Sequence, residues 1–171
     1  MRYALEPTPK VRRAVPEDAP GIVAVLAVVV DERVHSAIDR VWSIEQEQRY
    51  LELLSAREVI HVALDDAHRI VGLQILDRWS GMLDSTAHVG QVGTFVLPAW
   101  RGRGVGRELW HATAAFAREA RYQKLVVQVR GTNAPAQAFY RRIGFAECGR
   151  LSRQVIIDGT QDDEILMELF L

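Results

Sequence analysis

The segment Arg101-Gly102-Arg103-Gly104-Val105-Gly106-Arg107 constrains the fold of this chain more than any other part of the sequence. A β-rich run over 88–97 precedes it and stops at Pro98. The stretch after it has apolar residues at every third or fourth position, namely Val105, Leu109, Ala112, Phe116 and Ala120. That spacing predicts an amphipathic helix. The glycines let the backbone curl and aim its N–H groups at an anion, beside the positive end of the helix dipole. We therefore expect this loop to hold a phosphate or pyrophosphate.

Two other glycine-rich phosphate loops are excluded by their residues. A P-loop requires Gly-Lys-Ser or Gly-Lys-Thr, whereas Gly106 is followed by Arg107 and Glu108. A dinucleotide-binding fingerprint requires glycine at position 107 and an acidic residue about twenty positions further on, where Gln128 stands. A glycine-rich turn on a solvated basic edge is the remaining alternative. The coincidence of strand, glycines, arginines and helix disfavours it.

The rest of the pattern predicts one domain of the mixed α+β class. Residues 1–10 carry two prolines and no periodicity, so we expect a flexible N-terminal arm there and a single domain over 11–171. β-rich runs predict strands at 11–14, 58–64, 70–79, 88–97, 125–129, 145–157 and 164–170. Helical signals predict helices from Pro16, from Ile44 to about Arg57, from 105 onward, and over 134–142. The first of these helices has a predicted buried stripe of Ile22, Val25, Leu26 and Val29.

The glycine-rich loop resembles the pyrophosphate loop of the GNAT N-acetyltransferase superfamily, which reads Gln/Arg-x-x-Gly-x-Gly/Ala. Arg101, Gly104 and Gly106 fill its named positions. The segment 133–145 is similar to a second GNAT signature, Asn-x-x-Ala-x-x-x-Tyr-x-x-x-Gly-Phe, with every named residue present. The resemblance covers nearly all of 11–171. It implies a central, mostly antiparallel twisted sheet with a splayed cofactor-binding strand, flanked by about four helices.

The resemblance also implies acetyl-CoA as the cosubstrate. Backbone groups of Phe95, Val96 and Leu97 would then pair with the pantetheine arm as an added strand would. The pyrophosphate would lie on the loop Arg101, Gly102, Arg103, Gly104, Val105, Gly106 and Arg107. Further cofactor contacts are implied for Asn133, Ala136, Phe139 and Tyr140. Asn133 either caps its short helix or bonds the cofactor arm, and both interpretations stay open.

Tyr140 is the expected general acid. A phenol has a reference pKa of about 10, so it stays protonated at pH 7 and can donate to a departing thiolate. Packing beside Phe139 and Ile143 is the structural alternative, and the position of Tyr140 in the signature favours the catalytic role.

The sequence does not identify a general base. A lysine-like amine must lose a proton before it attacks, which costs about 4 to 5 kcal/mol at pH 7. Relatives often carry a glutamate at the position aligned with Gln91, and an amide cannot serve as that base. The alternatives are His88, Asp84, or waters ordered by Gln91. His88 and Gln91 fall on opposite faces of a regular strand, so at most one of them lines the acceptor cleft.

The acceptor site is expected in the less diagnostic segments 34–42 and 80–87, near Trp79, and in the final hairpin. Trp42 and Trp79 could wall an acceptor, but packing in the core is the favoured interpretation for each. The acidic residues of the hairpin could attract a cationic amine, although a solvated turn is favoured. They are Asp158, Asp162, Asp163 and Glu164.

Composition excludes several other classes of function. The 21 Lys and Arg nearly balance the 22 Asp and Glu, so no net field favours a nucleic acid or an anionic membrane as partner. The one cysteine, Cys148, excludes an internal disulfide, and we expect it to be a packed thiol. The histidines show no metal-ligand spacing, so no metal is predicted. No signal peptide or membrane span is indicated, and we expect a cytoplasmic protein, with a homodimer left open.

These observations predict an acetyl-CoA-dependent N-acetyltransferase that passes acetyl directly to a primary amine of a small molecule or amino-acid-like acceptor. Two alternatives stay open. One is an acyl-CoA sensor without transfer activity, which the replacement of a base by Gln91 suggests. The other is an enzyme that acetylates protein or peptide amines.

Overall fold

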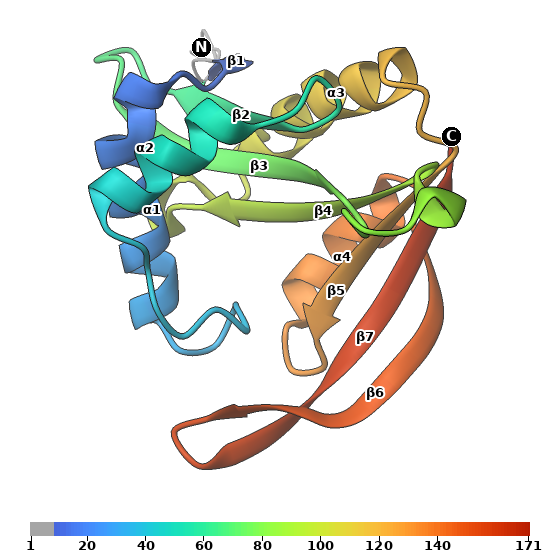
Figure 1. Cartoon of the computed structure of the whole chain (residues 1–171). Helices are drawn as coiled ribbons and strands as arrows, with labels where there is room; N and C mark the ends of the chain where they lie inside the picture. Colours follow the sequence, from blue (N-terminus) through green and yellow to red (C-terminus); the bar gives the residue numbers. More distant parts are fainter. Residues whose placement is uncertain (1–8) are drawn as a thin grey trace, which may run out of the picture.

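The computed structural model describes residues 9–171 and contains a seven-stranded sheet in the order β1-β2-β3-β4-β5-β7-β6 (Figure 1). All neighbouring strands are antiparallel except β4 and β5, which are parallel. The strands are β1 (Lys10–Arg13), β2 (Val59–Leu64), β3 (Ile70–Arg78), β4 (Val89–Val96), β5 (Lys124–Arg130), β6 (Ala146–Ile157) and β7 (Thr160–Phe170). The helices are α1 (Ala19–Asp31), α2 (Ile44–Leu53), α3 (Val105–Glu119) and α4 (Ala134–Arg142). The predicted mixed α+β class is confirmed.

The helices cover the two faces of the sheet in pairs. On the α1–α2 face, the predicted stripe of α1 is buried against alternate residues of β2 and β3, among them Ile60, Val62 and Leu73. On the α3–α4 face, Trp110 and Tyr140 pack against Leu76, Val92 and Leu125. Successive strand residues point to opposite faces, so each strand contributes to both cores. Burying one such large apolar side chain stabilises the fold by roughly 1.5–3 kcal/mol.

The main differences from the predicted elements are two boundaries and one helix face. Helix α2 ends at Leu53 rather than near Arg57, because Leu54 is extended and a closed turn follows from Ser55 to Glu58. Strand β7 starts at Thr160 rather than at 164. The turn before it has only two residues, Asp158 and Gly159, both with positive φ (50° and 77°), so the strands resume at once. In α3, Ala112 and Ala120 are only half-buried, because the buried face also includes Trp110, Thr113, Ala114 and Ala117.

The sheet splits between its two parallel strands. β4 and β5 pair at only three positions, the last being Gln91 with Val126, and then diverge (Figure 1). At Gly90 a Cβ would lie 2.7 Å from a methyl group of Leu76 and 2.9 Å from one of Leu125, so glycine leaves room for these two side chains to pack over the strand pair. The predicted splayed strand is therefore β4. It stays paired with β3 along one edge, and beyond Gln91 its other edge has no partner strand among the described residues.

Helix α2 begins with a capping box. Ser43 Oγ accepts the Gln46 N–H at 3.2 Å, and Gln46 Oε1 accepts the Ser43 N–H at 2.9 Å. We expect Ser43→Ala to lower the free energy of unfolding by about 1 kcal/mol, measured by urea denaturation. Ser152→Ala on the exposed edge strand is the control and should change it little. Equal effects of the two substitutions would show that the cap does not stabilise α2.

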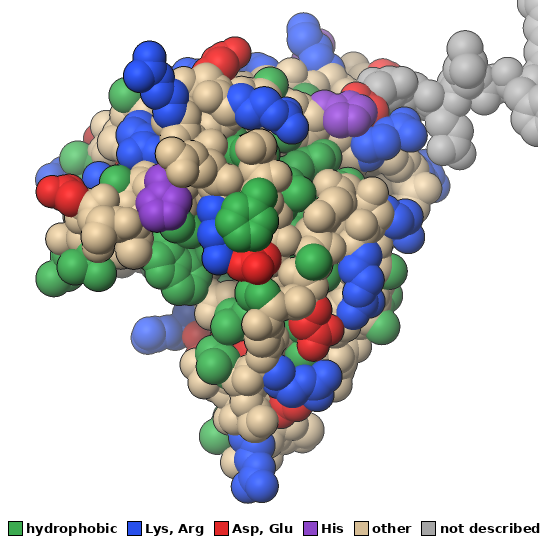
Figure 2. All heavy atoms as spheres, turned by 90° about the vertical axis from the view of Figure 1, so that its right-hand side faces the viewer, with side chains coloured by type: hydrophobic (Ala, Val, Ile, Leu, Met, Phe, Trp, Pro, Cys, Tyr) green, Lys and Arg blue, Asp and Glu red, His purple; other side chains and the backbone are tan. Residues whose placement is uncertain are grey.

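The surface at the paired end of β4 and β5 mixes basic, acidic and apolar side chains (Figure 2). No helix among the described residues is both long and apolar enough to cross a bilayer. Cys148, predicted to be packed, is exposed on the edge strand β6. Most of the arm predicted over 1–10 lies outside the described residues, and Lys10 already belongs to β1.

Candidate active site at the split of the sheet

A cavity of about 740 Å³ lies beside the split. Its walls come from β4, from the glycine-rich loop with the start of α3, and from α4. All the predicted cofactor-binding residues except Leu97 and Arg103 line it, and so do Val29, His35, Thr94 and Trp100. The fold thus brings two signatures that are separate in the sequence into one cavity.

The glycine-rich loop forms a cradle at one end of this cavity. Gly102 and Gly104 have φ values of 74° and 83°, in the left-handed region that glycine adopts without strain. Gly104 is the N-cap of α3, and no side chain within 9–171 caps the first turn, so the first N–H groups of this 15-residue helix are left for a ligand. At Gly106 a Cβ would lie 3.2 Å from the Phe139 ring, so α3 and α4 meet closely there. The cradle fits a phosphate group.

Arg101 does not direct a free guanidinium at this cradle. Its Nη1 and Nη2 donate to the two carboxylate oxygens of Glu32 at 2.9 and 2.5 Å, and its Nε donates to the Val96 carbonyl at 2.9 Å. Hydrogen bonding to Arg101 lowers the pKa of Glu32. Arg103 lies over the Trp100 ring, 5.8 Å from its centroid. A direct phosphate contact from Arg101 remains a prediction, whereas its link to α1 is a feature of the fold.

Backbone hydrogen bonding places only part of the predicted strand edge in the cavity. The Leu97 N–H donates to the Val71 carbonyl at 3.0 Å, and strand alternation turns Phe95 toward β3 in the same way. Val96 and Thr94 therefore direct their backbone groups to the open side. An amide-bearing ligand on this edge would meet the Thr94 backbone and the Val96 N–H, because the Val96 carbonyl already accepts from Arg101 Nε. Pairing of Phe95 and Leu97 with a cofactor remains a prediction.

Tyr140 lines the cavity and is 4% exposed, with Phe139 and Phe145 packed edge to face against its ring. Its hydroxyl is 2.8 Å from Thr94 Oγ1, and Gln74 Nε2 donates to the same Thr94 oxygen at 2.8 Å. Thr94 can therefore give its own proton to the phenol oxygen, which leaves the Tyr140 proton for a ligand. Burial raises the pKa of Tyr140 to about 12, so the phenol stays protonated.

Gln91, at the vertex of the split, is held by a row of side chains on the α1–α2 face. Gln91 Nε2 donates to Gln128 Oε1 at 2.9 Å, and Gln128 Nε2 donates to Glu164 Oε2 at 3.1 Å. The Glu164 carboxylate can only accept hydrogen bonds, so it fixes which way both amides point. Gln91 Oε1 is therefore left free to accept a hydrogen bond. His88, the other predicted residue, is exposed in the turn before β4. Neither Gln91 nor His88 is among the residues that line the cavity. The role of His88 as a base stays a prediction.

The residues after α1, at positions 32–35, form a strap across the split. Glu32 forms a salt bridge with Arg101 beside β4. Residues 33 and 35 are hydrogen-bonded to side chains on the other side of the split. The bonds there are Arg130 Nη1 to the Arg33 carbonyl at 2.7 Å and Asn133 Nδ2 to the His35 carbonyl at 2.9 Å. The strap therefore joins the two halves of the sheet where their strands do not pair.

Asn133 caps α4, which confirms one of its two predicted roles. Its Oδ1 accepts the Ala136 N–H at 3.1 Å, and its Nδ2 is used by the strap. A bond from Asn133 to a cofactor remains a prediction.

The aromatic and acidic residues considered for the acceptor side differ from expectation. Trp42 and Trp79, predicted to pack in the core, are 51% and 42% exposed. Three acids of the final hairpin are bound to arginines rather than simply solvated. The pairs are Asp158–Arg33, Asp162–Arg130 and Asp163–Arg150.

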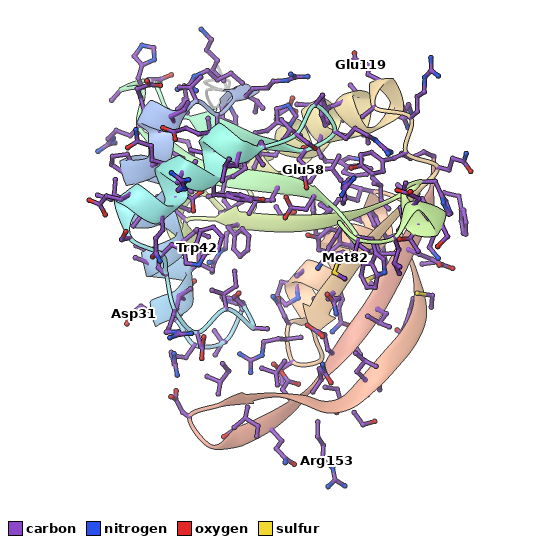
Figure 3. All side chains as sticks on the ribbon, viewed as in Figure 1. Asp31, Trp42, Glu58, Met82, Glu119 and Arg153 are labelled. Carbon is purple, nitrogen blue, oxygen red and sulfur yellow. The ribbon has the colours of Figure 1, made fainter. Side chains whose placement is uncertain are left out.

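A polar group beneath α2 was not anticipated from the sequence. The Tyr50 hydroxyl donates to Asp77 Oδ1, and Glu47 on the same helix face is 3% exposed. Trp42 packs edge-on against Tyr50, with ring centroids 5.3 Å apart. Figure 3 shows Trp42 and Glu58 on this side of the molecule. Within 9–171 no group of three or more metal-ligating side chains is arranged to hold a metal ion.

The sequence and the fold both match known acetyltransferases. The family model described as the acetyltransferase (GNAT) family matches residues 24–145. The chain belongs to the GNAT acetyltransferase family.

This GNAT chain is similar to two curated proteins over short segments. It is 50% identical over 54 residues to streptothricin acetyltransferase of Streptomyces lavendulae, covering 32% of this chain and 29% of that protein. It is 39% identical over 59 residues to aminoglycoside N(6')-acetyltransferase type 1 of Stenotrophomonas maltophilia, covering 34% of this chain and 39% of that protein. The match thus spans about a third of the length of these curated relatives.

Its fold matches that of solved GNAT structures over nearly the whole chain. The phosphinothricin acetyltransferase of Sinorhizobium meliloti, solved in complex with AcCoA, superposes with a TM-score of 0.88. The two chains are 19% identical, and the match covers 96% of this chain and 89% of the other. At this identity the likeness shows a common fold.

Proposed function

We propose that this GNAT chain is an acetyl-CoA-dependent N-acetyltransferase that acts on a primary amine of a small molecule. The observation that carries the proposal is a single cavity lined by the glycine cradle, by the open edge of β4 and by Tyr140, whose hydroxyl is bonded to Thr94. The names of the two curated relatives, a streptothricin and an aminoglycoside acetyltransferase, support a small-molecule acceptor.

The described residues fit coenzyme A in both polarity and backbone geometry. Gly102, Gly104 and the first N–H groups of α3 would hold its pyrophosphate, because that cradle offers donors without a side chain in the way. The backbone of Val96 and Thr94 would hold the amide-bearing arm. Acetyl-CoA supplies a thioester whose acetyl group an amine can take up.

The chain's own residues would orient the amine and handle the protons. Gln91 Oε1, fixed by Gln128 and Glu164, would accept an N–H of the amine and hold the amine at the vertex of the split. Tyr140 would donate its proton to the sulfur that leaves, and Thr94 would donate to the phenol oxygen as negative charge develops there. The proton lost by the amine goes to water, since none of these groups is a base at neutral pH.

Thr94→Val is expected to lower kcat about tenfold, because the loss of one hydrogen bond to a developing phenolate removes about 1.4 kcal/mol of stabilisation. Thr94→Ser keeps the hydroxyl and should retain most of the activity. Thiol release measured against a good amine acceptor checks both variants. A valine variant as fast as wild type would show that Thr94 does not support Tyr140.

The proposal is tested by calorimetry with acetyl-CoA, followed by thiol release across a panel of small amines and peptides. Binding together with transfer to small amines is the expected result. The absence of acetyl-CoA binding would overturn the proposal. Binding without transfer to any amine would favour the sensor alternative, and transfer to peptides alone would favour a protein acetyltransferase.

A further inference from the structure

Glu47 is a largely buried acid whose carboxylate has no partner among residues 9–171. It lies on the inward face of α2, one turn before the buried Leu51, and is 3% exposed. Within the described part of the chain, its side chain makes neither a hydrogen bond nor an ion pair. A buried carboxylate without a partner is costly, and proteins normally pair such groups. Glu47 is therefore left without a protein partner in the described chain and is able to pair with a cationic group of a ligand.

Asp77 lies under the same helix and is similarly short of positive charge. Its partner among residues 9–171 is the Tyr50 hydroxyl, which leaves the charge of an ionised Asp77 uncompensated. Burial raises the pKa of Glu47, and the Asp77 charge raises it further. Burial also raises the pKa of Asp77, and the Glu58 charge adds to this. The nearby Arg78 directs its Nη2 to the Gly81 carbonyl instead.

The acids of the final hairpin provide a contrast within the same chain. Each of Asp158, Asp162 and Asp163 has an arginine within 3.0 Å. Arginines thus neutralise three of the four hairpin acids, and the fourth, Glu164, accepts a hydrogen bond from Gln128. Beneath α2 the negative charge is left for a ligand.

The two acids lie next to the vertex of the split. Asp77 is directly opposite Gln91 in the β3–β4 register, so both side chains project from the same face of the sheet. Such cross-strand neighbours have Cβ atoms about 4.5–5.5 Å apart. Trp42, half-exposed and edge-on to Tyr50, adds an aromatic surface of the kind that attracts cations. A ligand amine at Gln91 would therefore have an acidic, aromatic-walled site within reach.

We propose that Glu47 and Asp77, with Tyr50 and Trp42 beside them, form a subsite for a second ammonium group of the acceptor. The preferred acceptors are then small molecules that carry two or more amines roughly 5–10 Å apart, or one to two strand spacings. This inference rests on the proposed function, because it assumes that the first amine is acetylated beside Gln91. The subsite itself can bind a diamine whether or not transfer follows.

The test compares 1,5-diaminopentane with 1-aminopentane, which has the same chain and one amine fewer. For wild type we expect kcat/KM for the diamine to exceed that for the monoamine at least tenfold. In Glu47→Gln this ratio should fall to near one. Glu52→Gln, on the exposed side of α2, is the matched control and should keep the wild-type ratio. A wild-type ratio near one, or an unchanged ratio in Glu47→Gln, would overturn the subsite.

Two further measurements separate the subsite from the proposed function. Calorimetry with 1,5-diaminopentane alone should show binding to wild type and at least tenfold weaker binding to Glu47→Gln. If that difference is found without any transfer, the subsite stands and the proposed function fails. If amines are acetylated without this difference, the function stands and the subsite fails. Asp77→Asn repeats both measurements if Glu47→Gln does not fold, as judged by circular dichroism.

Discussion

Replacing Tyr140 with phenylalanine should lower kcat by a hundredfold or more, while the Kd for acetyl-CoA changes less than about twofold. A positioned general acid contributes roughly 10²–10⁴-fold, and phenylalanine has no proton to give to the leaving sulfur. The ring itself stays packed between Phe139 and Phe145, so the wall of the cavity is kept. Single-turnover thiol release and calorimetry measure the two quantities.

Tyr122→Phe is the matched control for this substitution. Tyr122 is also 4% exposed, and its hydroxyl donates to the Arg57 carbonyl at 2.8 Å, away from the cavity. Losing that bond should reduce stability by about 1 kcal/mol and leave kcat unchanged. Equal activity of Tyr140→Phe and Tyr122→Phe would contradict the acid role.

The pH dependence gives an independent check on Tyr140. Burial favours the neutral phenol and raises its pKa to about 12, so ionisation of Tyr140 removes no activity as pH rises from 6 to 10. Deprotonation of the amine should instead make the rate rise with pH. A loss of activity near pH 9 that disappears in Tyr140→Phe would show that the pKa of Tyr140 is lower than its burial implies.

Gly104→Val should weaken acetyl-CoA binding by about thirtyfold or more. Gly104 has a φ of 83°, and a β-branched residue held in this region is strained by about 1–2 kcal/mol or more. Relief of that strain would rotate the first N–H groups of α3 away from the phosphate. The added Cβ meets no atom closer than Arg107 Nη2 at 3.6 Å, so the effect acts through the backbone. Calorimetry with acetyl-CoA gives the change.

Gly159→Val imposes the same backbone strain far from the cradle. Gly159 has a φ of 77° in the β6–β7 turn and open space around it. Both glycine variants should therefore lose similar stability, and only Gly104→Val should lose acetyl-CoA binding. Comparable binding losses in the two variants would mean that general destabilisation, rather than the cradle, explains the result.

Local patterns in the sequence predicted most of the fold because the signals for its elements are local. The stripe of α1 and the start of α3 are spaced on one helix face, and the Asp158-Gly159 pair marks a tight hairpin. The ends of α2 and β7 were missed, since side-chain bonds at Ser55 and turn geometry decide them. The exposure of Cys148 follows from its place on an edge strand, which depends on the strand order.

The two halves of the candidate site differ in how far they could be predicted. The phosphate cradle lies in one continuous segment, so glycine spacing is enough to find it. The acceptor side combines α2, β3 and β4, and the pairing of Asp77 with Gln91 depends on strand register that no local pattern contains. The engagement of Arg101 by Glu32 likewise joins residues far apart in sequence, which is why a free phosphate contact was expected instead.

The strap at 32–35 has a practical consequence for directed evolution of this chain. The split halves share only three strand pairs, so hydrogen bonds of the strap help to set the width of the cavity. Randomising these positions would change the cofactor side and the acceptor side together. A library intended to alter acceptor choice should therefore keep 32–35 constant and vary 36–42, the stretch that leads from the strap to α2 and includes Trp42.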